Sequence, residues 1–285
     1  MFMKRPMFDP TAALRWVSRA MLAGSVMLGS EQVAFADDHA AGDDDFEMSA
    51  TLYGWGVSFS GDTAIAGNTA EVDVGFGTLL ENFTGGGMAD VRLQYKNFGF
   101  FLNGVLGRAT ATIDGTVGRF AAQANLDMRL SFIDFGASYR FDPIPLGFDD
   151  GTGAVPSVSF EPYVGGRYTN IDVNVKFAGR FLAINSTTRF EFTDPIVGLK
   201  TNWKIAGRWR GVAMADIGGF GVGSDLSWNF IGAVGYDFSA FGERDATAFF
   251  GYRALGQDFS EGSGSTLLAW DVVAHGPIIG SAFRF

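Results

Sequence analysis

The chain contains no cysteine and only two histidines, and 18% of its 285 residues are charged. Without cysteine it can form neither a disulfide framework nor a Cys-ligated zinc or iron–sulfur site. After residue 36 the sequence also lacks any run of about 18–20 uncharged apolar residues, the length that a helix needs to cross a bilayer. These absences exclude a disulfide-stapled secreted scaffold and a helical membrane protein.

Glycine, phenylalanine and apolar residues in general are in excess. The chain has 40 Gly and 29 Phe, and 47% of its residues are hydrophobic, whereas average usage is about 7% for Gly and about 25% for charged residues. A chain this apolar can bury enough surface to fold, so disorder is excluded. Abundant Gly and Phe without a spanning helix indicate β-structure whose surroundings are not only water.

The first 36 residues have the features of an export signal. Four basic residues between Lys4 and Arg19 precede a short apolar core, Ala20–Leu28, and Ala34-Phe35-Ala36 fits a cleavage site. The alternative is a soluble amphipathic helix. Residues 37–47 are acidic and are expected to form a periplasmic N-terminal tail. Cleavage would remove four basic and two acidic residues and move the formal net charge from −10 to −12, so nucleic acid is not expected as a partner.

From Met48 onward the dominant period is two, as in strands with two unlike faces. Trp228, Phe230 and Phe238 share one face of their segment, and Asn229 and Asp237 share the other. A soluble β-sandwich would carry Lys and Glu on its polar face, whereas these polar faces are rich in Gly, Ala and Ser with scattered charges of both signs. Aromatic residues near strand ends suit membrane interfaces; Tyr53, Trp55, Tyr95, Phe141, Tyr168, Trp203, Trp209, Phe238 and Tyr252 are in such positions. The pattern favours an all-β, antiparallel transmembrane barrel in the bacterial outer membrane over a soluble β protein.

The turn signals divide residues 48–285 into about ten strands, with eight to twelve as the range. We expect strands over residues 48–60, 86–96, 97–114, 124–142, 157–175, 187–203, 208–218, 224–239, 245–258 and 267–285. Twelve would result if residues 63–66 and 71–75 crossed the membrane, but we interpret them as an extracellular hairpin. Phe76–Phe83 is expected to form a short helical turn in this first extracellular loop. Residues 61–85 and 176–186 are expected to be longer loops on the outer side.

The end of the chain carries a signal of its own. Ser281–Phe285 closes on an aromatic residue, and Phe283 and Phe285 share a face with Ile279. Bacterial outer-membrane barrels commonly end this way, so Phe283 and Phe285 are predicted to be the signal that the barrel-insertion machinery reads. The expected partners are therefore that machinery during biogenesis and outer-membrane lipid afterwards, and a monomer is expected.

The segment Asp216–Trp228 (DIGGFGVGSDLSW) resembles a widespread, functionally uncharacterised family of proteobacterial outer-membrane β-barrels. Other segments that fit are Tyr53–Trp55, Val72–Val74, Leu79–Asn82, Gly136–Arg140, Gly165–Tyr168, Asp194-Pro195, Gly251–Arg253 and Gly276–Phe285. The resemblance covers nearly all of the mature chain. It implies a barrel of the broad outer-membrane protein A-like type and no activity. Met214 departs from the family pattern, which has an Arg two residues before the matched Asp216.

Placing the apolar faces outward puts a network of charged residues inside the barrel. Its members are Asp90, Arg92, Asp134, Arg140, Arg167, Asp194, Lys200, Arg210, Asp216, Asp237 and Arg253. Because the two signs nearly balance, we expect ion pairs that brace a filled lumen, and a narrow solute path is the alternative. A wide pore is not expected, since it needs about sixteen strands. We predict that Arg253→Ala weakens heat-resistant folding, because removing one partner leaves a buried charge uncompensated.

Catalytic and cofactor signals are weak. His275 is the only histidine of the predicted barrel, and counting by twos from Phe285 places it on the lipid side unless Gly276-Pro277 forms a bulge. We expect no enzyme; the alternative is a lipid-modifying hydrolase that combines His275 with Ser260 or Ser265. One barrel histidine and no cysteine leave no transition-metal cluster, so neither a metal nor a cofactor is expected.

A glycine-rich loop is predicted on the outer side. Its residues are Gly218, Gly219, Phe220, Gly221, Gly223 and Asp225. It lacks the Lys-Ser/Thr pair and the helix of a phosphate loop, so a tight turn without a ligand is expected.

The sequence thus predicts an integral outer-membrane barrel with a narrow, charge-lined lumen. Its role would be structural, or that of a small-solute conduit or a surface-binding module. A further alternative is an adhesin that acts through residues 61–85 and 176–186.

Overall fold

The computed structural model describes residues 46–65, 67–117, 120–147, 155–179, 182–240 and 244–285. The predicted signal peptide, residues 1–36, and nearly all of the predicted tail lie outside the described residues. The boundary of the barrel is two residues earlier than predicted, because β1 (Phe46–Trp55) already includes Glu47. Glu47 belongs to the wall because its carboxylate pairs with Arg140 at 3.3 Å.

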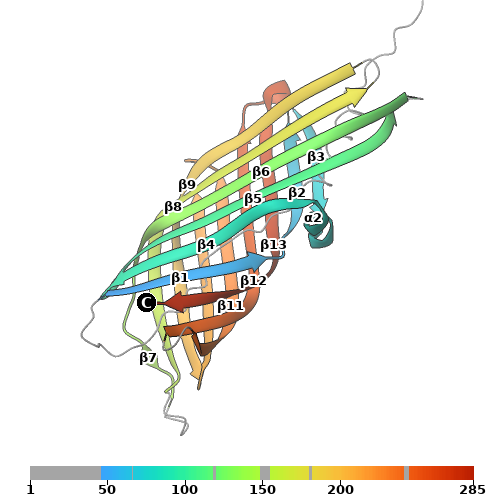
Figure 1. Ribbon diagram of the computed structural model, residues 1–285. Helices are drawn as coiled ribbons and strands as arrows, with labels where there is room; N and C mark the ends of the chain where they lie inside the picture. Colours follow the sequence, from blue (N-terminus) through green and yellow to red (C-terminus); the bar gives the residue numbers. More distant parts are fainter. Residues whose placement is uncertain (1–45, 66, 118–119, 148–154, 180–181, 241–243) are drawn as a thin grey trace, which may run out of the picture.

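Ten strands close into an antiparallel barrel (Figure 1). In order around the wall they are β1, β4 (Phe83–Tyr95), β5 (Phe98–Val117), β6 (Phe120–Tyr139), β8 (Ser157–Gly179), β9 (Leu182–Ala206), β10 (Trp209–Gly219), β11 (Leu226–Ala240), β12 (Arg244–Glu261) and β13 (Leu268–Arg284). β13 pairs with β1 and completes the circle. The predicted fold class and strand number are confirmed.

Paired residues followed once around the wall show how steeply the strands tilt. The path runs from Glu47 through Gln94, Gly99, Ser138, Tyr163, Gly198, Asp216, Asn229, Leu255 and Ala274 to Phe59. After one full circuit the path arrives at Phe59 and not at Glu47, which is a displacement of twelve residues along the chain. Such a stagger over ten strands corresponds to a tilt of about 40°, which is typical of closed barrels.

A hairpin and a short helix follow β1. β2 (Ser58–Ile65) continues along β13, and β3 (Asn68–Val74) pairs with β2. The predicted hairpin is therefore present, but it extends the barrel wall and is not a loop above it. The helix α2 (Phe76–Asn82) confirms the predicted helical turn. The remaining elements are β7 (Ile144–Pro145), which pairs with β8, and the 3-10 helix η1 (Gly264–Thr266). In the described residues no helix is long and apolar enough to cross a membrane.

The prediction of a long loop over residues 176–186 is wrong. β8 continues to Gly179 and β9 begins at Leu182, so these residues extend two paired strands. Asn174 and Thr187, at the ends of the two predicted strands, face each other on the outward side and bond at 2.6 Å, and the pairing continues beyond them. Residues 61–85 and 176–186, through which the adhesin alternative would act, are mainly strand or helix where the structure describes them.

The outward face of the barrel is apolar along a continuous band. On β5, Phe98, Phe100, Leu102 and Leu106 are each more than half exposed, and on β13 Ile279 is 70% exposed. Charged side chains meanwhile lie inside, which is the reverse of a soluble protein and the arrangement of a transmembrane barrel.

Two aromatic residues depart from the predicted membrane-interface positions. Trp55 is 1% exposed and lies inside the barrel. Tyr53 shares its inward phase, and its hydroxyl accepts a hydrogen bond from Asn103. The sequence analysis placed Tyr53 and Trp55 near the end of a strand. They lie instead midway along a longer stretch of wall, because β1 and β2 pair one after the other with β13.

Candidate functional site in the barrel interior

A central ion-pair cluster lies midway along the barrel. The Arg167 guanidinium contacts Asp134 at 2.9 Å and Asp216 at 3.1 Å. Asp216 also accepts hydrogen bonds from Tyr163 and Asn229. These side chains come from β6, β8, β10 and β11, which lie on one side of the wall with β9 between β8 and β10. Two carboxylates around one guanidinium, with further donors from Tyr and Asn, hold the three charges in a fixed arrangement.

Arg253 joins this cluster from β12. Its Nε donates to the side-chain Oδ1 of Asn229 at 3.0 Å, and its guanidinium lies 4.5 Å from the centre of the Trp55 ring. Arg253 and Arg167 are each only 1% exposed. Both guanidinium groups are therefore shielded from solvent by the side chains packed around them.

A second cluster gathers around Glu161 nearer the end of the barrel that carries the C-terminus. The Glu161 carboxylate lies 3.2 Å from Arg92, 3.6 Å from Arg140 and 3.8 Å from Lys200, and it accepts a hydrogen bond from Ser138. Asp90 contacts Arg92 at 3.3 Å. Three cations thus surround one carboxylate, and Asp90 and Glu47 balance the remaining charge.

A third cluster lies at the rim of the same end. Asp237 contacts Arg210 at 2.6 Å and Arg284 at 3.6 Å. Thr247 donates to Asp237 and accepts from Arg284. These contacts tie β10, β11, β12 and β13 together where the strands end.

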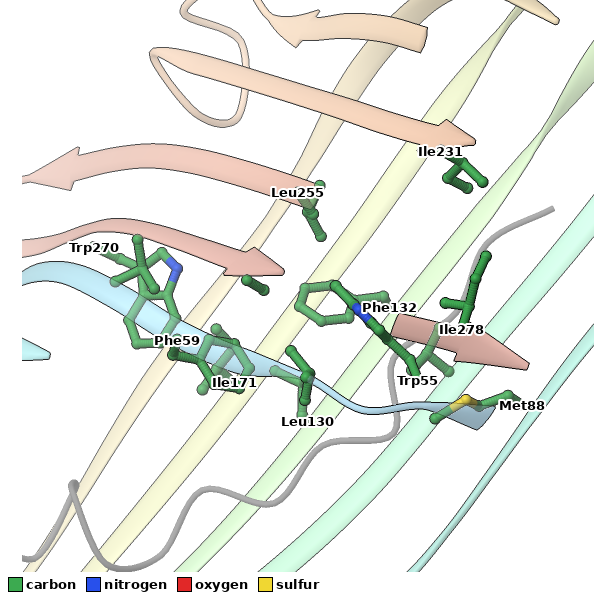
Figure 2. Close-up of a cluster of buried hydrophobic side chains, with 14 of the residues drawn as sticks. Trp55, Phe59, Met88, Leu130, Phe132, Ile171, Ile231, Leu255, Trp270 and Ile278 are labelled. Carbon is green, nitrogen blue, oxygen red and sulfur yellow. The ribbon is translucent and has the colours of Figure 1, made fainter. Parts of the chain in front are cut away.

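Towards the other end the interior is apolar. Phe190 packs edge-on against Phe259 and beside Trp270, with ring centres 6.3 Å and 5.6 Å apart. Phe192 stacks on Phe259 at 4.7 Å. Figure 2 shows side chains from many strands converging on the interior of the barrel; those labelled include Trp55, Phe59, Leu130, Phe132, Ile171, Leu255 and Trp270. We call the part of the interior around Phe190, Phe192, Phe259 and Trp270 the apolar layer. It lies between the ion pairs and the end of the barrel away from the C-terminus.

The structure places all eleven predicted network residues on the inward face, but it divides them. Asp134, Arg167, Asp216 and Arg253 form the central cluster; Asp90, Arg92, Arg140 and Lys200 belong to the Glu161 cluster; and Arg210 and Asp237 form the rim cluster. Asp194 stands apart from all three. Glu161, Tyr163, Asn229 and Arg284 were missed, although Glu161 and Tyr163 lie in phase with Arg167 along β8. A strict count by twos from Arg167 would have found both.

Asp194 explains the glycine-rich motif. Its carboxylate accepts hydrogen bonds from the Ser224 backbone N–H at 2.6 Å and from the Ser224 hydroxyl at 2.8 Å. Gly223 lies so close that an added Cβ would come within 2.6 Å of this carboxylate. Gly219 and Gly221 have φ of 87° and 72°, which glycine adopts without strain. The motif therefore builds the tight turn that the sequence predicted, folded back onto β9.

Replacing Asp194 with alanine should loosen this turn. Ser224 is fully buried, so its N–H and hydroxyl would lose their acceptor at a cost of about 1–3 kcal/mol. We expect chymotrypsin to cleave after Phe220 faster in Asp194→Ala than in the wild type. Asp225→Ala is the matched control, because Asp225 is exposed and accepts a side-chain bond from Ser260 alone among the described residues. Equal cleavage of the two variants would contradict the capping role.

His275 lies on the outward face, as the count from Phe285 predicted. The pairing of β12 with β13 runs without a shift through Gly276-Pro277, so no bulge reverses the phase. The His275 ring bonds to the Tyr252 hydroxyl at 2.7 Å. Ser260 is six positions further along β12 than the residue opposite His275, which is about 20 Å away, and Ser265 is beyond it in η1. The predicted serine–histidine set is therefore not brought together.

No group of three or more His, Asp or Glu side chains within the described ranges is placed to hold a metal ion. Phe283 and Phe285 lie at the end of the closing strand, and Phe285 exchanges backbone hydrogen bonds with Met48 of β1.

An apolar outer band, inward ion pairs and closure by ten antiparallel strands define a transmembrane β-barrel of the bacterial outer membrane. No protein-family model matches the chain, and no curated protein matches it either. The resemblance of Asp216–Trp228 to one particular barrel family therefore stays a prediction.

Solved outer-membrane proteins are similar to this chain at low identity. Ail, the attachment invasion locus protein of Yersinia pestis solved with the heparin analogue sucrose octasulfate, is 10% identical over 84% of this chain and 98% of its own, with a TM-score of 0.34. Neisserial surface protein A is 14% identical over 86% and 98%, with a TM-score of 0.27. OmpT, an outer membrane protein of Vibrio cholerae, is 9% identical over 84% and 99%, with a TM-score of 0.22.

Proposed function

We propose that this barrel is sealed along its axis and acts at the cell surface, as a membrane-anchored binding module and not as a solute conduit. The observation that carries the proposal is the apolar layer. A hydrated solute passing from the outer end would have to cross side chains such as Phe190, Phe259 and Trp270, each at most 7% exposed. Beyond them it would meet ion-paired arginines that fill the remaining lumen.

The lengths of the strands support a role outside the membrane. A tilted strand crosses a bilayer in about 9–11 residues, yet β5 and β6 have 20 residues each, β8 has 23 and β9 has 25. Figure 1 shows these four strands projecting together past one end of the barrel. About half of each strand is therefore available to build a surface outside the lipid.

The outward face of this projecting sheet changes from apolar to charged. On β5, exposed Leu106 is followed on the same face by Arg108. Directly across the neighbouring strands the partners are Arg129, then Asp172, then Arg189. Arg108 also pairs with Asp127 at 2.7 Å. A row of charges on a sheet that projects beyond the bilayer is a surface suited to a charged partner.

Solute flux tests the proposal. Proteoliposomes containing the barrel should swell in glycerol, glucose or arginine no faster than protein-free liposomes, and planar bilayers in molar KCl should show no stepwise conductance. Swelling that falls with solute size, together with discrete channels, would establish a conduit and contradict the proposal.

A further inference from the structure

The inward face of β9 carries a run of polar side chains towards the end of the barrel that holds the C-terminus. Lys200 and Asn202 are 1% and 7% exposed, and Lys204, the next residue on the same face, is partly exposed. On β8, Glu161 lies directly opposite Lys200, and Ser159, which is 1% exposed, lies directly opposite Asn202. We call Ser159, Lys200 and Asn202 the donor site.

The polar atoms of the donor site have no hydrogen-bond partners among the described residues. They are the Lys200 Nζ, the Ser159 Oγ, and both the nitrogen and the oxygen of the Asn202 amide. The neighbouring strand β10 offers no partner, because Met214 lies opposite Lys200 and Val212 lies opposite Asn202. Buried polar side chains in proteins are nearly always hydrogen-bonded, and a buried group without a partner is costly. Orphaned atoms on three adjacent buried side chains therefore indicate a ligand from outside the chain.

The donor site offers mainly hydrogen-bond donors. The Lys200 ammonium has three N–H groups, the Asn202 amide has two and the Ser159 hydroxyl has one. The acceptors of the site are the amide oxygen and the lone pairs of the hydroxyl. A ligand that accepts from an ammonium, an amide and a hydroxyl together is suited to be an anion.

The positive charge of this region is only partly balanced. The Glu161 carboxylate lies 3.8 Å from the Lys200 Nζ, which is longer than a hydrogen bond. Glu161 is also shared with Arg92 at 3.2 Å and Arg140 at 3.6 Å. Lys204 has no carboxylate at ion-pair distance within the described part of the chain. The charge near the donor site therefore also favours an anion.

The exposure of the interior rises towards this end of the barrel. The side chains of Arg140 and Asp237 are 16% and 18% exposed, whereas Arg167, in the central cluster, is 1% exposed. Lys204 is partly exposed between this rim and Asn202. An ion from the aqueous phase at this end thus meets partly exposed side chains on its way to Asn202, and it does not cross the apolar layer.

We propose that Ser159, Lys200 and Asn202 bind one small monovalent anion of the size of chloride. Directly opposite residues of neighbouring strands have Cβ atoms about 5 Å apart, so these side chains are close enough to direct their donors at a single ion. A monatomic anion accepts hydrogen bonds from every direction, which suits donors that come from two strands. The site is independent of the proposed surface function, because it lies on the inner side of the wall and at the opposite end from the projecting sheet.

Stability in different salts tests the site. Urea unfolding of the barrel in phosphatidylcholine vesicles is compared in potassium chloride and in potassium gluconate at equal ionic strength. An anion that binds only the folded barrel lowers the unfolding equilibrium constant about tenfold when its concentration is about ten times its Kd. Chloride should therefore stabilise the wild type. Asn202→Leu should respond equally to both salts, and in gluconate it should be at least as stable as the wild type, because it no longer buries an amide without partners.

Asn185→Leu is the matched control. Asn185 lies on the same strand but is exposed, so this variant should gain as much from chloride as the wild type does. Equal stability of the wild type in the two salts, or an equal gain for the wild type and Asn202→Leu, would overturn the proposal. An equal gain of the wild type in potassium acetate would overturn the assignment to a monatomic anion.

The chlorine-35 magnetic resonance signal gives a second readout, because it broadens when chloride exchanges with a protein site. The wild type should broaden the signal more than Lys200→Met and Asn202→Leu do, and added bromide should reverse the excess. Lys176→Met, at an exposed lysine of β8, controls for loss of charge and should broaden the signal as the wild type does. If Lys200→Met does not fold, Asn202→Leu decides. Equal broadening by the wild type and Asn202→Leu would contradict binding at the donor site.

Discussion

Replacing Arg167 with leucine is expected to destabilise the folded barrel by about 3–5 kcal/mol. The guanidinium is 1% exposed and lies between Asp134 and Asp216. Removing it leaves two carboxylates buried without their main counter-charge, and that penalty exceeds the net value of the ion pairs themselves. Urea unfolding in lipid vesicles, followed by the band shift of unheated samples, measures the loss.

Arg108→Leu is the control for charge removal as such. Arg108 pairs with Asp127 at 2.7 Å, but both side chains are partly exposed, so the cost should be no more than about 1 kcal/mol. Replacing Asp134 and Asp216 by asparagine in the Arg167→Leu background should recover much of the stability. Equal losses for Arg167→Leu and Arg108→Leu, or no recovery, would show that the central cluster does not brace the wall.

Arg253→Ala should cost less than Arg167→Leu. The hydrogen-bond partner of its Nε is the neutral Asn229, and its contact with the Trp55 ring contributes about 2 kcal/mol. The temperature at which the folded band disappears should therefore fall, but by less than in Arg167→Leu. This ranking refines the expectation drawn from sequence, which treated all the interior charges as equivalent.

Replacing Phe190 with alanine is the second change with a large expected effect. The ring is 1% exposed and packs against Phe259 and Trp270. Its removal leaves a cavity in the apolar layer, and such changes cost about 3–5 kcal/mol. The same urea unfolding measures the loss, and near-ultraviolet circular dichroism should report weaker ordering of Trp270.

Phe220→Ala is the matched control, because it removes the same atoms from an exposed position in the outer turn. Its effect should stay within about 0.5 kcal/mol. If Phe190→Ala were as stable as Phe220→Ala, the apolar layer would not be a packed core, and the case for a sealed lumen would lose its main support.

The period of two made most of the fold predictable. Alternation fixes which residues face lipid, and it placed every predicted interior charge on the correct face, from Asp90 to Arg253. It also placed His275 outside, since one shared phase runs from Phe285 through β13. The sequence of each strand sufficed for these predictions, because successive side chains of a strand point alternately to the lumen and to the lipid.

Three features depended on information that local pattern does not contain. The division of the charges into clusters follows from the stagger around the barrel, which decides that Glu161 meets Lys200 from the next strand and Arg92 from a distant one. Trp55 lies in the interior because β1 and β2 pair one after the other with β13, so that Trp55 is not at a strand end. The point at which β1 and β4 stop pairing, at Leu52 and Ala89, is likewise not marked in either sequence segment.

The most direct test of a sealed interior is the reactivity of single cysteines in the apolar layer. Val272→Cys and Asp271→Cys are adjacent on β13, but Val272 is 3% exposed and faces inward whereas Asp271 is exposed and faces outward. A small cationic methanethiosulfonate reagent requires water to reach the thiol. In a sealed barrel it should modify the Asp271→Cys variant rapidly and leave the Val272→Cys variant unmodified until the protein is unfolded. Modification of both at similar rates in the folded barrel would contradict closure by the apolar layer.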